Sequence, residues 1–249
     1  MATTTMSSTR IEVSSGVERA RVVLGAGAVV PRLVERGPSS ARIALVAGGA
    51  LLLGGDEVSI EVDVGDGCTL DLEEIGGTVA YRADGRPSTW TVTVRVSRDA
   101  SLAWAGLPFV VSDGAAVVRR MDVRLTGGGV ALLRETLVLG RSGERGGWID
   151  TTLAAGDDDG PILHERLVVE GGAPMVGVLG EHRVLDTVSA LGFRPPPIGP
   201  AGTVLDLDEP GAVSRFLGAD THASPLDQTW SVWRDALSPV PRPTPVVVP

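Results

Sequence analysis

The feature that most limits the fold of this chain is a period of two in its hydrophobic residues. From Val58 to Val64 every second residue is apolar, and the residues between them include Ser59, Glu61 and Asp63. Successive side chains of a β-strand point to opposite faces, so this pattern predicts a strand with one buried face. The other face is strongly acidic. It is either the solvated side of a sheet or the border of a route for cations.

Similar short runs, rich in Val, Leu, Ile or Thr and closed by Gly or Asp-Gly, recur along most of the chain. The 33 glycines mostly mark the joints between them, where a positive φ angle is needed. No strict repeat length is evident. The pattern predicts a mainly β fold, with many short strands in stacked antiparallel or mixed sheets, as a β-sandwich or a β-helix-like arrangement.

The last fifth of the chain has a different pattern, which predicts two short helices. The first is expected at about 208–218, where Asp208 is a candidate N-cap. In that segment Val213, Phe216 and Leu217 have the spacing of one helical face.

The second helix is expected at 225–237, with Ser224 as its N-cap and Pro225 at its first position. Its apolar residues form a stripe that favours core packing over a partner interface. We therefore expect one mainly β domain over residues 1–238, followed by a Pro-rich tail at 239–249. The stripe consists of Leu226, Trp230, Trp233 and Leu237.

Composition excludes several classes of function. The net charge of −9 argues against binding to nucleic acid or to an anionic membrane. All 22 basic residues are arginine, so a Walker-type phosphate loop and a Schiff-base mechanism are excluded. The single cysteine, Cys68, rules out an internal disulfide and a Cys-x-x-Cys metal site. The start of the chain has no signal-peptide pattern and no apolar run is long enough for a bilayer, so we expect a cytoplasmic protein.

No preformed metal or catalytic motif stands out, so no tightly bound cofactor is expected. The three histidines lack the spacing of a metal site, and no Gly-x-Ser-x-Gly elbow is present. Asp113 lies in a Ser-Asp-Gly segment that is typical of a β-turn with an Asp cap. The Gly-rich loop at 140–147 carries two arginines and a glutamate, and such loops place charges at a surface.

Several blocks of the sequence, taken in order, resemble the UreD (UreH) family of urease accessory proteins. The segment GGDEVSIEVDVGDG, followed by TVAYRADG, is similar to the family's hairpin and its Val-Tyr-Arg-like stretch. LAWAGLPFVVSDGAA resembles the next block, and LLRETLVLGRSGERGG resembles a strand followed by Leu-Gly-Arg and Gly-Glu. The closing SVWRDAL is similar to the family's terminal helix. The resemblance covers about residues 32–237.

The resemblance implies a non-enzymatic scaffold and metallochaperone with a mainly β fold. It implies binding to apo-urease and to UreF, binding to the GTPase UreG through UreF, and help in passing Ni²⁺ to the urease site. Homodimer formation within such a complex is left open. Transient nickel ligands are expected at Glu135, Asp113 and Asp56, and partner contacts at Arg141, Glu144, Tyr81, Trp230 and Trp233.

Two other readings stay open at this point. One is a β-sandwich hydrolase that uses paired carboxylates, such as Glu73, Glu74 or Asp113, as acid and base. The other is a ligand-binding module that uses surface carboxylates.

Overall fold

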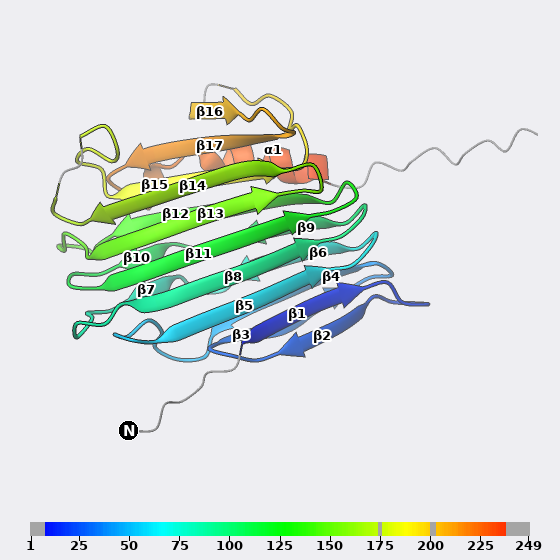
Figure 1. Ribbon diagram of the computed structural model, residues 1–249, viewed down its shortest axis with the longest axis horizontal. Coiled ribbons are helices and arrows are strands. Elements are labelled where there is room, and N and C mark those ends of the chain that lie inside the picture. The colour runs from blue at the N-terminus through cyan, green and yellow to red at the C-terminus, as the bar shows by residue number, and fades with distance from the viewer. Residues whose placement is uncertain (1–7, 174–175, 200–202, 238–249) are drawn as a thin grey trace, which may run out of the picture.

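The computed structural model describes residues 8–173, 176–199 and 203–237 (Figure 1). Their strands form two sheets that stack face to face, which confirms the expected mainly β class. The proline-rich tail expected at 239–249 lies outside the described residues.

The seven-stranded sheet has the spatial order β14-β13-β11-β8-β5-β1-β2. Its five central strands are parallel, and the strands at its two edges are antiparallel to their neighbours. Its members are β1 (Thr9–Ser14), β2 (Arg21–Gly25), β5 (Glu57–Val64), β8 (Ser88–Val96), β11 (Ala116–Leu125), β13 (Trp148–Gly156) and β14 (Pro161–Glu170).

The ten-stranded sheet has the order β16-β17-β15-β12-β9-β6-β4-β3, and the two short strands β7 and β10 pair beside β12. Strands β4, β6, β9 and β12 are parallel. The members of this sheet are β3 (Val29–Arg36), β4 (Ser40–Ala47), β6 (Thr69–Glu74), β7 (Thr78–Ala80), β9 (Ser101–Ala105), β10 (Phe109–Val111), β12 (Val130–Leu139), β15 (Val184–Leu191), β16 (Thr203–Asp206) and β17 (Gly211–Gly218).

From β4 to β13 the chain winds as a solenoid, passing from one sheet to the other and adding a parallel strand to each in turn. The register therefore aligns Val58, Trp90, Arg119 and Thr151 in four neighbouring strands of the seven-stranded sheet. This is the β-helix-like form of the expected fold. The repeat is hidden in the sequence because the alternation of inward and outward residues recurs, but the residue types do not.

The hydrophobic core fills the space between the sheets. Ile60 and Val92 enter it from the seven-stranded sheet, and Leu72, Trp104 and Leu133 enter it from the ten-stranded sheet. Complete burial of one such aliphatic side chain stabilises the fold by about 1.5–3 kcal/mol. The apolar residues that recur with a period of two are therefore the residues on the inward faces of both sheets.

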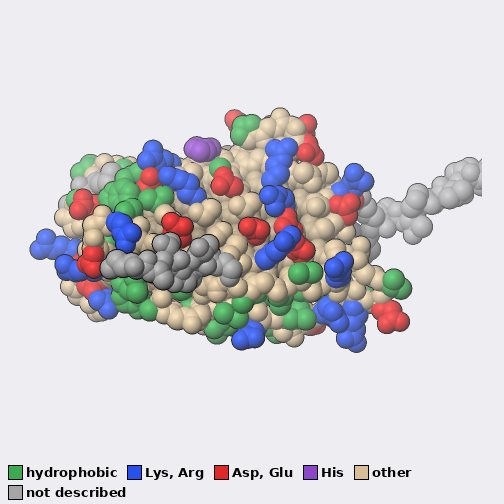
Figure 2. Space-filling model, turned by 60° about the horizontal axis from the view of Figure 1, so that its bottom comes forward, with side chains coloured by type: hydrophobic (Ala, Val, Ile, Leu, Met, Phe, Trp, Pro, Cys, Tyr) green, Lys and Arg blue, Asp and Glu red, His purple; other side chains and the backbone are tan. Residues whose placement is uncertain are grey.

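The acidic face of β5 points outward from the seven-stranded sheet. Ser59, Glu61 and Asp63 are partly exposed, whereas the alternate residues of β5 are buried. Arg95 of the neighbouring strand donates to Asp63 over 3.2 Å. Figure 2 shows acidic and arginine side chains interspersed on the surface. This face is thus the solvated side of a sheet, and a role as the border of a cation route stays a prediction.

Helix α1 (Leu226–Leu237) covers part of the outer face of the ten-stranded sheet and confirms the second expected helix. The Ser224 hydroxyl accepts a hydrogen bond from the N–H of Leu226, as an N-cap should. Leu226, Trp233 and Leu237 are buried against Leu132, Val188, Ala190 and Ala212 of the sheet. The stripe is therefore used in core packing. Among the described residues no helix is long and apolar enough to cross a membrane.

The prediction of a helix at about 208–218 is wrong. Strand β17 occupies most of this segment, and a 3-10 turn (Thr221–Ala223) follows it. β17 pairs with β15 on one side and with β16 on the other. Ala212 packs with the residues beneath α1, while neighbouring Val213 is buried as well. A strand that is covered on both faces has no simple alternation, so the spacing of its apolar residues resembled that of a helix.

Candidate functional site

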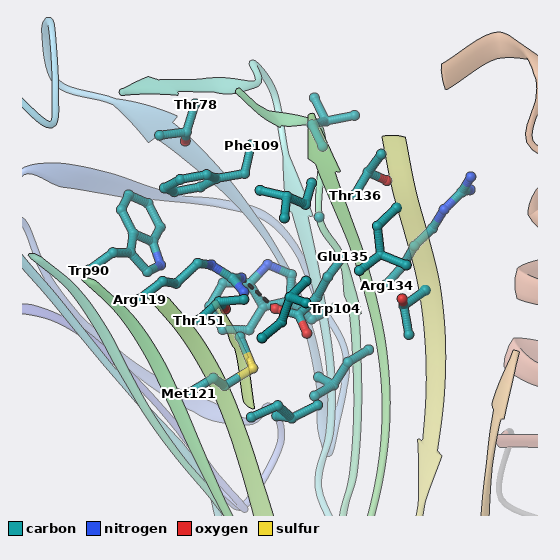
Figure 3. A pocket seen from close by; sticks show the side chains of 18 of the residues that line it. Thr78, Trp90, Trp104, Phe109, Arg119, Met121, Arg134, Glu135, Thr136 and Thr151 are labelled. Carbon is teal, nitrogen blue, oxygen red and sulfur yellow. Dashed lines mark ion pairs between the residues drawn. The ribbon is translucent and has the colours of Figure 1, made fainter. Parts of the chain in front are cut away.

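Two charged side chains interrupt the apolar lining between the sheets. Arg119 extends from β11 and Glu135 extends from β12, and they form an ion pair across the gap (Figure 3). The two side chains are only 16% and 20% exposed. Such a pair keeps its charges in the interior because each charge compensates the other, so removal of one partner is strongly destabilising.

The ion pair lies in a cavity of about 80 Å³ between the sheets. A buried water needs about 10–15 Å³ on the same measure, so several waters fit. The wall of the cavity is mixed: Trp90, Trp104 and Met121 are apolar, while Thr151 and Thr187 offer hydroxyl groups. The cavity can therefore hold hydrated polar groups inside an otherwise apolar core.

An aromatic pair helps to hold the guanidinium of Arg119. Its Cζ atom lies 5.5 Å from the centre of the Phe109 ring. Phe109 in turn packs edge-to-face against Trp90, with the ring centres 5.8 Å apart. Contact of a cation with an aromatic face is favourable, so these rings partly replace the water that the guanidinium has lost.

Glu74 forms one end of the cavity wall. It ends β6, and the backbone N–H of Leu107 donates to its carboxylate over 3.0 Å. Burial raises the pKa of Glu74 above its usual value, although the Leu107 bond and the charge of Arg119 oppose this. Gly106, the residue before Leu107, passes close to β12. A Cβ atom on Gly106 would lie 2.6 Å from the Arg134 carbonyl oxygen. Only glycine permits this approach of the two strands.

A second ion pair joins the two sheets near the edge where β14 ends the seven-stranded sheet and β16 ends the ten-stranded sheet. Arg215 of β17 donates to Glu165 of β14 over 2.7 Å, and Glu165 also lines the cavity. Three carboxylates and one guanidinium thus line the cavity, namely Glu74, Glu135, Glu165 and Arg119, and the second guanidinium, Arg215, pairs with Glu165, whose side chain is 37% exposed.

On the outer face of β12, the residue before Glu135 anchors helix α1. Arg134 donates to the buried Asp186 over 2.9 Å and to Asp227 of α1 over 2.6 Å, and it points away from Arg119 in Figure 3. The hydroxyls of Thr136 and Ser224 also donate to Asp186. Burial lowers the pKa of Arg134, but the bonds to the two carboxylates outweigh it and leave the pKa raised.

The glycine-rich loop at 140–147 folds around two carboxylates. Glu144 accepts from the backbone N–H of Arg141 and from its guanidinium, each over 2.9 Å. These bonds lower the pKa of Glu144 to about 2. Asp113 accepts from the backbone N–H groups of Arg145 and Gly146 over 2.9 and 2.7 Å. Asp113 therefore lies in a turn, as its sequence context indicated, but its carboxylate caps the 140–147 loop and not its own turn.

The structure does not bring the three expected nickel ligands together. Glu135 is interior, while Asp113 caps the 140–147 loop and Asp56 accepts from the N–H of Leu53 over 2.9 Å. No group of three or more His, Cys, Asp or Glu side chains suited to a metal occurs in the described part of the chain. A role in nickel transfer for each of the three stays a prediction.

The expected partner residues divide into two places. Tyr81 is 36% exposed and lies near Arg141, so these two lie with Glu144 at one end of the solenoid. Trp233 is 1% exposed, and its ring N–H donates to the Pro196 carbonyl over 3.2 Å, so it fixes α1 on the sheet. Trp230 keeps part of its surface exposed, and contact with a partner stays a prediction for it.

The structure does not place together the carboxylates that were considered as the acid and base of a hydrolase. Glu73 and Glu74 are successive residues of β6 and point to opposite faces; Glu73 lies 3.8 Å from Arg42 on the outside. The Asp113 carboxylate is engaged by the backbone N–H groups of the 140–147 loop. This arrangement provides no acid–base pair of the expected kind.

Sequence reasoning missed Arg119, Glu165 and Arg215, although one signal was present. In VVRRMDVRL, Arg119 occupies the same parity as Val117 and Met121, which are buried. A charged residue on the apolar parity of a strand must either be paired inside the protein or break the strand.

Comparison with known proteins gives one consistent result. The family model described as UreD urease accessory protein matches residues 23–248. Urease accessory protein UreD 1 of Streptomyces griseus is 41% identical over 228 residues, covering 89% of this chain and 88% of the relative. UreD 3 of the same species is 31% identical and covers 78% of this chain and 85% of the relative. UreD 2 of Saccharopolyspora erythraea is 31% identical, with 86% and 82% covered.

Proposed function

The chain belongs to the UreD family of urease accessory proteins, and from this membership we propose that it is a cytoplasmic, non-catalytic scaffold that delivers nickel to urease. In this role it binds apo-urease and UreF, and through UreF the GTPase UreG, and it assists the passage of Ni²⁺ to the urease active site. The family match over most of the chain supports a part in urease maturation.

The observation that carries the nickel part of the proposal is the polar cavity between the sheets. Glu74, Glu135 and Glu165 place three carboxylates along a space that has room for water. The seven- and ten-stranded sheets cover this space on two sides, and the Glu135 side chain within it is 20% exposed. Carboxylates in a protected, hydrated interior are suited to guide a divalent cation that must not be lost to competing ligands.

The chemistry of the donor set favours transit over storage. Ni²⁺ accepts carboxylate and water ligands, but the sites that hold it tightly use several imidazole or thiolate groups. The cavity lining contains neither histidine nor cysteine among the described residues. Arg119 and Arg215 also neutralise two of the carboxylates, which weakens their attraction for a cation. A site of this composition binds Ni²⁺ briefly and releases it, as a delivery route requires.

The proposal is tested in a host that lacks its own copy of this protein but has the other urease genes. Glu135→Gln removes the charge from the cavity and nearly keeps the side-chain shape. Glu61→Gln makes the same change on the outer face and serves as the control. We expect the first variant to lower the nickel content and activity of urease, while the second leaves both unchanged.

Co-purification separates the two halves of the proposal. If wild-type protein captures neither UreF nor apo-urease, the scaffold role is wrong. If Glu135→Gln protein captures both partners and urease still receives its full nickel, the scaffold role stands but the cavity has no part in delivery.

A further inference from the structure

The two stacked sheets end at different places on the side of β14. The seven-stranded sheet ends at β14, whereas the ten-stranded sheet continues past β15 with β17 and β16, which Figure 1 shows above β14. The ion pair between Glu165 of β14 and Arg215 of β17 fixes where the shorter sheet ends over the longer one. Neighbouring strands lie about 4.8 Å apart, so the longer sheet extends far enough to support roughly one or two further strands beside β14.

The free edge of β14 carries a row of backbone groups without a partner strand. The ladder between β13 and β14 continues in the bond from the N–H of Gly171 to the Gly147 carbonyl. In this antiparallel pair the odd-numbered residues of β14 therefore bond to β13. The even-numbered residues His164, Arg166 and Val168 turn their N–H and C=O groups to the open side, and among the described residues no strand or loop bonds to these groups.

The strands at the other three ends of the sheets carry features that discourage a further strand. β16 and β2 have only four and five residues. β3 has eight residues, but Pro31 lies within it and its register shifts between Leu33 and Glu35. β14 has ten residues, and its proline and its register shift lie at its start. An inward charge also discourages pairing, but Glu165 is already neutralised by Arg215.

Leucine side chains lie beside this edge on the inward face of the longer sheet. Leu133 of β12 faces the core, and the pairing carries this face across β15 to Val213 of β17 and Leu205 of β16. Leu217 lies on the same face as Val213, since the two are four residues apart in one strand. Val213 is buried, but Leu205 and Leu217 are 50% and 37% exposed. We call the surface formed by Leu205, Leu217 and the free edge of β14 the shelf.

From these observations we propose that an extended segment of a protein partner binds at the shelf as a further strand of the seven-stranded sheet. Its backbone pairs with β14, and alternate side chains of the segment are apolar and pack on Leu205 and Leu217. The row of free backbone groups selects this occupant, because only a strand offers complementary N–H and C=O groups at the same spacing. The inference rests on the scaffold role proposed above and names a surface that performs it.

A second copy of this chain does not fit at the shelf. Two β14 strands would pair as antiparallel edges about a two-fold axis perpendicular to the sheet. In that arrangement the β17–β16 extensions of the two ten-stranded sheets would have to occupy the same space, since each extends past its own β14. The shelf therefore has room for a segment that brings no second layer beneath it.

The backbone part of the inference is tested with Val168→Pro. This change removes an N–H that faces the open side of an edge strand, where proline is tolerated. Val168→Thr keeps the N–H and is the control. Affinity is measured for purified UreF and for apo-urease. We expect Val168→Pro to weaken binding of one of them by about tenfold or more, and Val168→Thr to stay within about twofold of wild type. Melting temperatures show that both variants are folded.

The apolar part is tested with a charge placed on either face of β16. Leu205→Asp alters the shelf, whereas Val204→Asp makes the same change on the neighbouring residue, which is 40% exposed on the opposite face. Leu205→Asp should weaken the same partner as Val168→Pro by about tenfold or more. Val204→Asp should leave that affinity within about twofold of wild type.

Hydrogen exchange identifies the occupant. The amide of Val168 should exchange freely in the isolated chain and be protected in the complex. Wild-type affinity of both Val168→Pro and Leu205→Asp for every partner would overturn the inference and leave the scaffold role standing.

Two other occupants would also overturn it. Protection in the isolated chain that is lost on truncation after Leu237 would show that the chain's own residues 238–249 occupy the shelf. A dimer that Val168→Pro dissociates would show that a second copy does. Binding of neither partner by wild type would remove the scaffold role and this inference together.

Discussion

The ion pair between Arg119 and Glu135 gives the sharpest prediction about stability. Its side chains are 16% and 20% exposed, and the pair bridges the two sheets inside the core. Replacement of Arg119 by Met removes the guanidinium but keeps a side chain of similar reach, so Glu135 is left as an unpaired interior charge. Breaking a buried pair by removal of one partner costs about 3–5 kcal/mol.

Because the pair keeps some solvent contact and the cavity admits water, we expect the lower part of that range, about 3 kcal/mol. For a chain of this size that corresponds to a fall in melting temperature of roughly 6–12 °C. Glu135→Leu should cost a similar amount. The double variant Arg119→Met, Glu135→Leu should be closer to wild type than either single variant, because it leaves no uncompensated charge.

The assay is urea unfolding of the four proteins, analysed as a double-mutant cycle. The outward pair Arg95–Asp63 is the control, since its side chains are 60% and 32% exposed, and Arg95→Met should cost less than about 1 kcal/mol. If both interior single variants are as stable as the control, the pair is not buried in solution. The account of the cavity would then be refuted.

Three further predictions follow from other parts of the fold. Trp233→Ala should lower stability by about 3–5 kcal/mol in urea unfolding, because the ring is fully buried beneath α1; a change below about 1 kcal/mol would contradict that packing. The folded-state pKa of Glu144 is depressed from 4.5 to about 2, so its contribution to stability should be complete above pH about 4.5 and be lost as the pH falls toward 2. A pH titration of wild type against Glu144→Gln checks this, and parallel curves over that range would refute it. Equilibrium dialysis of the isolated chain with Ni²⁺ should find no tight site; a stoichiometric, sub-micromolar site with nitrogen or sulfur ligands would oppose the transit account.

The sequence predicted the β class because alternation is a local property. The inward positions of β5 are visible without any knowledge of their neighbours, since each strand repeats its own pattern. The same reasoning failed for β17, where both faces are covered and the local pattern carries no information about pairing. Helix α1 was correctly predicted because its N-cap and its apolar stripe are encoded in consecutive residues.

Only part of the candidate site could be predicted from the sequence, for a related reason. Glu135 was singled out, but its partner Arg119 lies sixteen positions earlier on a strand of the other sheet, and only the winding of the chain brings them together. Asp113 and Asp56 were expected as transient ligands from the resemblance to the UreD family. The structure shows that both carboxylates cap backbone N–H groups.

The central claim is that cations pass through the space between the sheets, and it is tested most directly by filling that space. Thr151 lines the cavity, whereas Thr91 is exposed on the outer face of the same sheet. Each is replaced by Phe, and the nickel content of urease is measured in a host that carries only the altered protein. Complex formation and melting temperature are monitored in parallel, since overpacking at Thr151 should cost about 1–3 kcal/mol. The account predicts that Thr151→Phe protein assembles with its partners but leaves urease deficient in nickel, while Thr91→Phe protein restores it fully. Full nickel loading by folded Thr151→Phe protein would contradict the claim.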